Sequence, residues 1–151
     1  MTGSRRKARE VALQALYWSE SSGDPVQRTL DAVALRAGLT EDAAEFAHAL
    51  GRETWLRKEE LNGLIEGISR NWALDRISRI DRILLWMALT EMLAFDNIPV
   101  KVSMNEAIEL AKRYSVEKAP TFINGILDTL VRQKGVIEKP VDCRLSVDNS
   151  L

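Results

Sequence analysis

The stretch ISRIDRILLWMALTEMLAF, Ile77–Phe95, is the most hydrophobic part of this 151-residue chain and decides its fold. Its apolar side chains recur at helical spacing, as in Ile80, Ile83, Leu84 and Met87. A helix that is apolar around most of its circumference must be buried among other elements. The stretch therefore predicts the central helix of a domain, with other helices packed around it.

Three helical segments are predicted before the central helix. They cover approximately residues 8–19, 25–38 and 40–68. Pro25 suits the first turn of the second segment, and Gly38 suits its end, because these residues favour opposite helix termini. Thr40 is a predicted N-cap of the third. That segment is either one long helix or two, with Gly51 and Gly63 as the candidate weak points.

Two helices are predicted after the central one. Ser103-Met104-Asn105-Glu106 fits a capping box, in which side chains three residues apart satisfy free backbone donors. The last helix is predicted to start near Pro120, to bury a face that includes Phe122, and to stop at Gly135. Within this helix Gly125 is predicted to be a point of close helix packing and Asn124 a structural hydrogen-bonding residue, with a functional role as the alternative.

The pattern as a whole predicts an all-α protein of about six or seven helices. No convincing alternating strand is found in the sequence, and Asn71-Trp72 marks a junction between helices. Residues 136–151 contain Pro140 and show no periodicity. We therefore predict a helical domain over residues 1–135, followed by a mobile C-terminal tail over 136–151.

The composition argues against enzymatic function and against a metal or cofactor. Cys143 is the single cysteine and His48 the single histidine, so neither a His-based triad nor a zinc site with several histidines can be built. There is no glycine-rich phosphate loop after a strand. No apolar run approaches the roughly 20 residues of a membrane span, and no secretory signal is present. The expected location is the cytoplasm.

Four cations near the start of the chain, Arg5, Arg6, Lys7 and Arg9, are the main functional signal. With Glu10 they give residues 1–10 a net charge of +3, whereas the whole chain carries −1. The helix macrodipole disfavours cations at a helix N-terminus, so phosphate binding is a better explanation than helix stability.

The helical spacing also predicts an exposed flank beside these cations. At about 100° per residue, Arg6, Arg9, Leu13 and Tyr17 follow one ridge. Arginine can grip phosphates in a bidentate manner, and tyrosine can stack on an unpaired base. The alternative is a solubilising charge run in which Tyr17 closes the rim of the core. This segment alone leaves both interpretations open.

Three blocks of sequence carry a resemblance to a known family. They are RRKAREVALQALY at 5–17, IDRIL at 80–84 with ALTE at 88–91 and a final Ile98-Pro99, and NEAIELAK at 105–112 with FINGILD at 122–128. In this order and at this spacing, over approximately residues 4–134, the chain resembles the NusB family of bacterial transcription antitermination factors. The resemblance implies a non-enzymatic, all-helical protein made of two packed helical subdomains.

The resemblance also implies partners and site residues. Family members bind the boxA element of ribosomal-RNA leader transcripts together with the ribosomal protein NusE, and this pair helps to assemble an antitermination complex with other Nus factors on RNA polymerase. The residues implied to face RNA are Arg5, Arg6, Lys7, Arg9, Tyr17, Lys118 and Phe122. Those implied to face NusE are Asp81, Arg82 and Trp86. Trp86 and Thr90 depart from the arginine and tyrosine that the family often has, which changes the surface of the central helix.

Two other functions are weighed against direct RNA binding. One is a protein-interaction module of the same fold that does not bind RNA. The other is an accessory domain like the one at the front of ribosomal-RNA cytosine methyltransferases, which the absence of a following catalytic domain in this sequence disfavours. Some family members form homodimers that mask the RNA surface, and the sequence leaves the choice between monomer and homodimer open.

Overall fold

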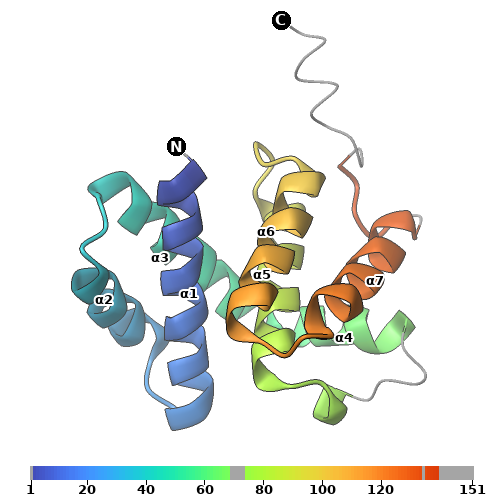
Figure 1. Ribbon diagram of the computed structural model, residues 1–151, viewed down its shortest axis with the longest axis horizontal. Helices are drawn as coiled ribbons and strands as arrows, with labels where there is room; N and C mark the ends of the chain where they lie inside the picture. The colour runs from blue at the N-terminus through green and yellow to red at the C-terminus, as the bar shows by residue number, and fades with distance from the viewer. Residues whose placement is uncertain (1, 69–73, 134, 140–151) are drawn as a thin grey trace, which may run out of the picture. The chain divides into compact units, whose positions relative to one another are not determined.

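The computed structural model describes residues 2–68, 74–133 and 135–139, and these residues form seven α-helices and one short 3₁₀ helix (Figure 1). No strand occurs among them, so the all-α prediction is confirmed. The chain divides into two compact units, Met1–Lys58 and Glu59–Leu151. The predicted junction at Asn71-Trp72 lies outside the described residues.

The first unit consists of α1 (Thr2–Ser22), α2 (Val26–Ala37) and α3 (Glu41–Leu56), each packed against the other two. Alanines on one side of α1, including Ala8, Ala12 and Ala15, are completely buried. Side chains this small allow neighbouring helices to approach closely, and larger residues such as Leu16 fill the rest of the core. The buried stripe therefore agrees with the predicted helical periodicity.

Local sequence signals set most helix ends of the first unit. Gly38 ends α2 in the left-handed conformation, with φ of 63°, and its N–H donates to the carbonyl oxygen of Leu35. The Thr40 hydroxyl accepts a hydrogen bond of 3.3 Å from the Ala43 N–H, which confirms the predicted N-cap. Pro25 lies just before α2 rather than inside its first turn. The start of α1 at Thr2 is earlier than predicted.

The segment predicted as one or two helices is interrupted at Arg57, between α3 and α4 (Lys58–Ile68). Neither Gly51 nor Gly63 breaks its helix, so both predicted weak points are wrong. Gly51 serves a different purpose: a Cβ atom added to it would lie 2.7 Å from Cδ2 of Leu30. This glycine therefore allows α3 to approach α2 closely.

We expect Gly51→Ala and Gly63→Ala to change stability in opposite directions. Gly63 is exposed, with no atom within 4 Å of an added Cβ, so alanine should raise the free energy of unfolding by about 0.5–1 kcal/mol through helix propensity. At Gly51 the clash with the fully buried Leu30 side chain should outweigh that gain and lower the free energy by about 1 kcal/mol. Urea unfolding of both variants measures the difference, and equal gains would show that α2 and α3 are not closely packed.

His48 forms a further link between α2 and α3. Its Nε2 atom lies 2.7 Å from Oδ1 of Asp31, and its Nδ1 atom lies 2.8 Å from the carbonyl oxygen of Ala44. The hydrogen bond with His48 is the main reason that the pKa of Asp31 is lowered from its ordinary value. The only histidine of the chain is therefore a structural residue, held between two acceptors.

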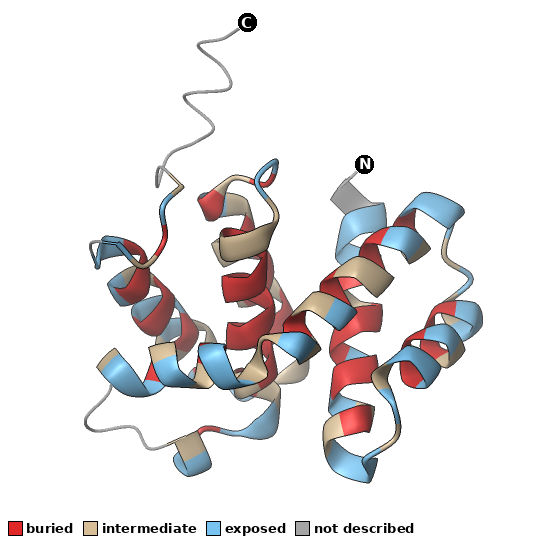
Figure 2. Ribbon diagram, turned by 180° about the vertical axis from the view of Figure 1, so that it is seen from behind, coloured by how far each residue is buried: buried red, intermediate tan, exposed pale blue. Residues whose placement is uncertain are grey.

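The second unit is organised around α5 (Arg79–Ala94). Residues 83–92 are all buried, and α5 is red along most of its length in Figure 2. α6 (Val100–Tyr114) and α7 (Ala119–Arg132) pack against α5 and against each other. The short 3₁₀ helix η1 (Leu74–Arg76) precedes α5. The predicted central helix is therefore confirmed.

The predicted capping box at residues 103–106 is wrong. α6 already begins at Val100, directly after Pro99, so Ser103 lies one turn inside the helix. Its hydroxyl donates a 2.8 Å hydrogen bond to Oε1 of Glu91, and both side chains are buried. Ser103 thus provides a hydrogen bond to a buried carboxylate of the central helix. A local sequence pattern does not reveal this partner, because Glu91 lies on another helix.

The end of the last helix also differs from the prediction. α7 starts at Ala119 with Pro120 in its first turn, as predicted, but it ends at Arg132, before Gly135. Phe122 is half-buried rather than fully inside the core.

The segment after α7 returns to the central helix. Ile137 is buried, and Nζ of Lys139 donates to the carbonyl oxygens of Glu91, Phe95 and Ile98. These bonds tie Lys139 to the last turn of α5 and to the loop that follows it. The first residues of the segment predicted as a tail are therefore held in place, and residues 140–151 lie outside the described part of the chain.

Candidate nucleic-acid interface

The N-terminal part of α1 carries an exposed basic surface. The side chains of Arg5, Arg6 and Lys7 are all exposed. Because α1 begins at Thr2, only Arg5 falls in its first turn. The macrodipole acts mainly within the first turn, so these cations oppose it less than the sequence suggests.

Arg9 does not belong to this exposed surface, which corrects the predicted flank. Its side chain is 4 % exposed, and Leu13 one turn later is also buried. The Arg9 guanidinium carbon lies 5.2 Å from the centroid of the Phe46 ring. Because almost the whole residue is buried, the guanidinium group of Arg9 lies out of solvent together with its apolar stem. Tyr17, the last residue of the predicted ridge, is 39 % exposed and remains accessible for stacking.

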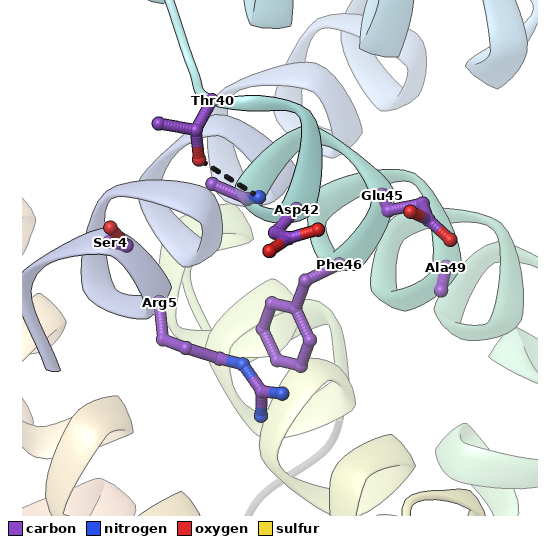
Figure 3. A pocket seen from close by; sticks show the side chains of 8 residues that line it. Ser4, Arg5, Thr40, Asp42, Glu45, Phe46 and Ala49 are labelled. Atoms are coloured by element: carbon purple, nitrogen blue, oxygen red, sulfur yellow. Dashed lines mark hydrogen bonds between the residues drawn. The ribbon is translucent and has the colours of Figure 1, made fainter. Parts of the chain in front are cut away.

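A surface hollow of about 590 Å³ lies beside the basic surface, within the first unit. It is lined by Ser4 and Arg5 of α1 and by residues around the start of α3, namely Thr40, Asp42, Ala43, Glu45, Phe46 and Ala49 (Figure 3). The Arg5 guanidinium carbon lies 4.2 Å from the centroid of the Phe46 ring. Within the described part of the chain, this guanidinium has no hydrogen-bond or ion-pair partner. Its N–H donors are therefore available to an anionic ligand.

Phe46 is the residue of this site that sequence reasoning missed. Its helical position predicts a core residue, and the side chain is indeed 8 % exposed. The signal for a further role is its contact with two arginines of α1. That contact joins distant parts of the chain and becomes visible only in the folded protein.

The other predicted RNA contacts lie in the second unit. Lys118 is exposed and directly precedes α7, and Phe122 is half-buried one turn later. Asn124 and Gly125 on the same helix are both exposed, and no atom lies within 4 Å of a Cβ added to Gly125. The prediction that Gly125 is a close packing point is therefore wrong.

The structure gives structural roles to two of the three residues predicted to face NusE. Trp86 is 2 % exposed, and its indole N–H donates a 2.8 Å hydrogen bond to Oδ1 of Asn62. Asp81 is 7 % exposed and accepts a 2.7 Å hydrogen bond from the Ser115 hydroxyl. Buried side chains cannot form a docking face, so we remove Trp86 and Asp81 from the predicted surface. Arg82 remains half-buried, with its guanidinium carbon 5.8 Å from the Trp86 ring centroid.

Two features are absent from the described residues. Histidine, cysteine and carboxylate side chains do not gather there into a group that could hold a metal ion. None of the helices in this part combines the length and the apolar character that crossing a membrane requires.

These features define an all-α protein whose first helix presents a cationic surface suited to phosphate. The NusB family model matches residues 6–132, which is most of the chain. The chain belongs to the NusB family.

Individual relatives agree with this assignment. The chain is 45 % identical over 130 residues to the transcription antitermination protein NusB of Salinibacter ruber, covering 85 % of this chain and 81 % of that protein. The solved structure of T. maritima NusB matches with a TM-score of 0.77 and 33 % identity, covering 83 % of this chain and 88 % of that one. A crystal structure of NusB and NusE in complex with double-stranded RNA matches with a TM-score of 0.77 and 25 % identity, covering 85 % and 96 % of the two chains.

Proposed function

We propose that this protein is a non-enzymatic transcription antitermination factor that binds boxA-type single-stranded RNA together with NusE. The observation that supports RNA binding is the exposed trio Arg5, Arg6 and Lys7 on α1. The name shared by its relatives, and a related structure that contains NusB, NusE and RNA, support the rest. In this role the pair helps to assemble a complex with other Nus factors on RNA polymerase, in the cytoplasm.

The chemistry of binding follows from the residues of α1. The guanidinium groups and the ammonium group of the exposed trio hold phosphates, which fixes the RNA backbone without reading its sequence. Tyr17 stacks on an unpaired base, which favours single-stranded RNA over a closed duplex. Lys118 and Phe122 supply a second contact of the same two kinds, one charge and one aromatic ring.

We place the NusE-binding face on the second unit and retain Arg82 as its candidate residue. This side chain is half-buried at the start of the central helix, so part of it is available to a partner. Trp86 and Asp81 support this region from inside through their hydrogen bonds to Asn62 and Ser115.

A mobility-shift assay with labelled boxA RNA, with and without NusE, tests the proposed function. We expect a shift with this protein that becomes stronger when NusE is added. The alternative function, a protein-interaction module, predicts NusE binding with no RNA shift at any protein concentration. A duplex of the same sequence should run beside the single strand, because a relative has been crystallised with double-stranded RNA. A preference for the duplex would contradict the single-strand part of the proposal.

A further inference from the structure

The Phe46 ring is a shared support for two arginines of another helix. It comes from α3, whereas Arg5 and Arg9 come from α1, and their guanidinium carbons lie 4.2 Å and 5.2 Å from the ring centroid. The aromatic side chain is only 8 % exposed, so α3 holds it firmly within the first unit. Figure 3 shows the Arg5 side chain extended across the hollow toward this ring.

Contact with an aromatic ring leaves the binding capacity of a guanidinium group largely intact. The ring attracts the cation through the face of the guanidinium plane, whereas the N–H donors point outward within that plane. An unrestrained arginine loses much rotamer freedom when it grips a phosphate. A ring that orders the side chain in advance reduces this loss on binding.

Carboxylates around the hollow make this support more important. Asp42 and Glu45 line the hollow together with Arg5. An arginine drawn toward either acid would present less positive charge to RNA. The Phe46 ring competes with these carboxylates for the Arg5 guanidinium. In its position over the ring, Arg5 forms no ion pair within the described part of the chain.

We propose that Phe46 is a positioning residue for RNA binding, which holds the exposed Arg5 in the orientation that phosphates require, while the buried Arg9 packs against the same ring. This inference rests on the proposed function. Phe46 itself does not contact RNA, because its ring is buried beneath the arginines. Phe46→Leu should therefore weaken binding of boxA RNA about two- to fivefold, because the contact that orders the Arg5 guanidinium is lost.

The salt dependence separates positioning from direct contact. Phe46→Leu keeps every cation, so the slope of log K against log salt should stay as in the unaltered protein. Arg5→Ala removes a phosphate contact and should reduce that slope by about 0.7. Phe46→Tyr keeps the aromatic ring and should retain the affinity. Leu30→Val, a change to a fully buried residue of α2, controls for lost core packing and should bind RNA normally.

Three results would overturn the proposal. The first is full RNA affinity in Phe46→Leu while Arg5→Ala binds weakly, which leaves the proposed function intact. The second is equal weakening by Leu30→Val and Phe46→Leu. The third is measured on the unaltered protein by NMR. Contact with the Phe46 ring should displace the chemical shifts of the Arg5 side-chain protons through the ring current. Shifts typical of a solvent-exposed arginine would mean that the ring does not hold Arg5. By contrast, normal RNA binding after loss of Arg5, Arg6 and Lys7 together would count against the proposed function itself.

Discussion

Replacing Arg5, Arg6 and Lys7 together by alanine is expected to weaken boxA RNA binding about 100-fold at 0.1 M salt. All three side chains are exposed on α1. Each phosphate contact to a single strand contributes a slope of about 0.7 to log K against log salt, which corresponds to about fivefold per contact between 1 M and 0.1 M salt. Fluorescence anisotropy across a salt series should therefore show both a lower affinity and a slope reduced by about 2.

The matched control removes the same charge elsewhere in the first unit. Arg28, Arg36 and Arg52 are exposed on α2 and α3, and their joint replacement by alanine should change RNA affinity by less than about twofold. Equal weakening by both triple variants would mean that net charge, rather than the α1 surface, attracts RNA.

The α1 variant also tests whether the cations support the fold. Cations near a helix N-terminus are unfavourable, so its free energy of unfolding should be unchanged or slightly raised. A clear loss of stability would instead give these residues a structural role.

Trp86→Ala is expected to cause the largest loss of stability, lowering the free energy of unfolding by about 3–5 kcal/mol. The side chain is 2 % exposed, and its removal leaves a large cavity in the second unit. The Asn62 amide oxygen would also lose its hydrogen bond from the indole N–H. Urea unfolding followed by circular dichroism measures the change.

Trp86→Phe separates the cavity from the hydrogen bond. Phenylalanine keeps most of the apolar volume but has no N–H, so we expect a smaller loss of about 1–2 kcal/mol. If Trp86→Ala instead retained full stability and abolished NusE binding, Trp86 would be a surface residue of the partner face, and its buried position would be contradicted.

Local sequence signals predict helix ends well where a neighbouring residue itself satisfies the free backbone groups of the helix. Thr40 and Gly38 act within one turn of their own helix ends, so their roles follow from the residue type and the neighbouring pattern. The central helix was predicted because its apolar side chains cover nearly its whole circumference.

The predictions fail where a residue far away in the sequence determines the role of a side chain. Ser103 looks like a helix cap, but the buried carboxylate of Glu91 takes its hydroxyl. Gly51 looks like a weak point, but Leu30 on another helix explains its lack of a side chain. The pairing of residues far apart in sequence is set by tertiary packing, which periodicity does not encode.

The candidate site likewise combines features that follow from the local pattern with features that depend on tertiary packing. Helical spacing correctly placed Arg6 and Tyr17 on an exposed side of α1, but it also placed Arg9 there. A helical wheel gives direction around an axis and does not show that Arg9 packs against Phe46 of α3. For the same reason, Asp81 could not be recognised as a buried acceptor for Ser115.

Binding of RNA to the basic surface of α1 can be followed residue by residue with NMR. Unlabelled boxA RNA is added to isotope-labelled protein, and the backbone amides and arginine Nε–H groups are followed. We expect the largest shifts at Arg5, Arg6 and Lys7, with smaller changes at the exposed cations of α2. No shift in α1, or shifts spread equally over α1 and α2, would contradict it.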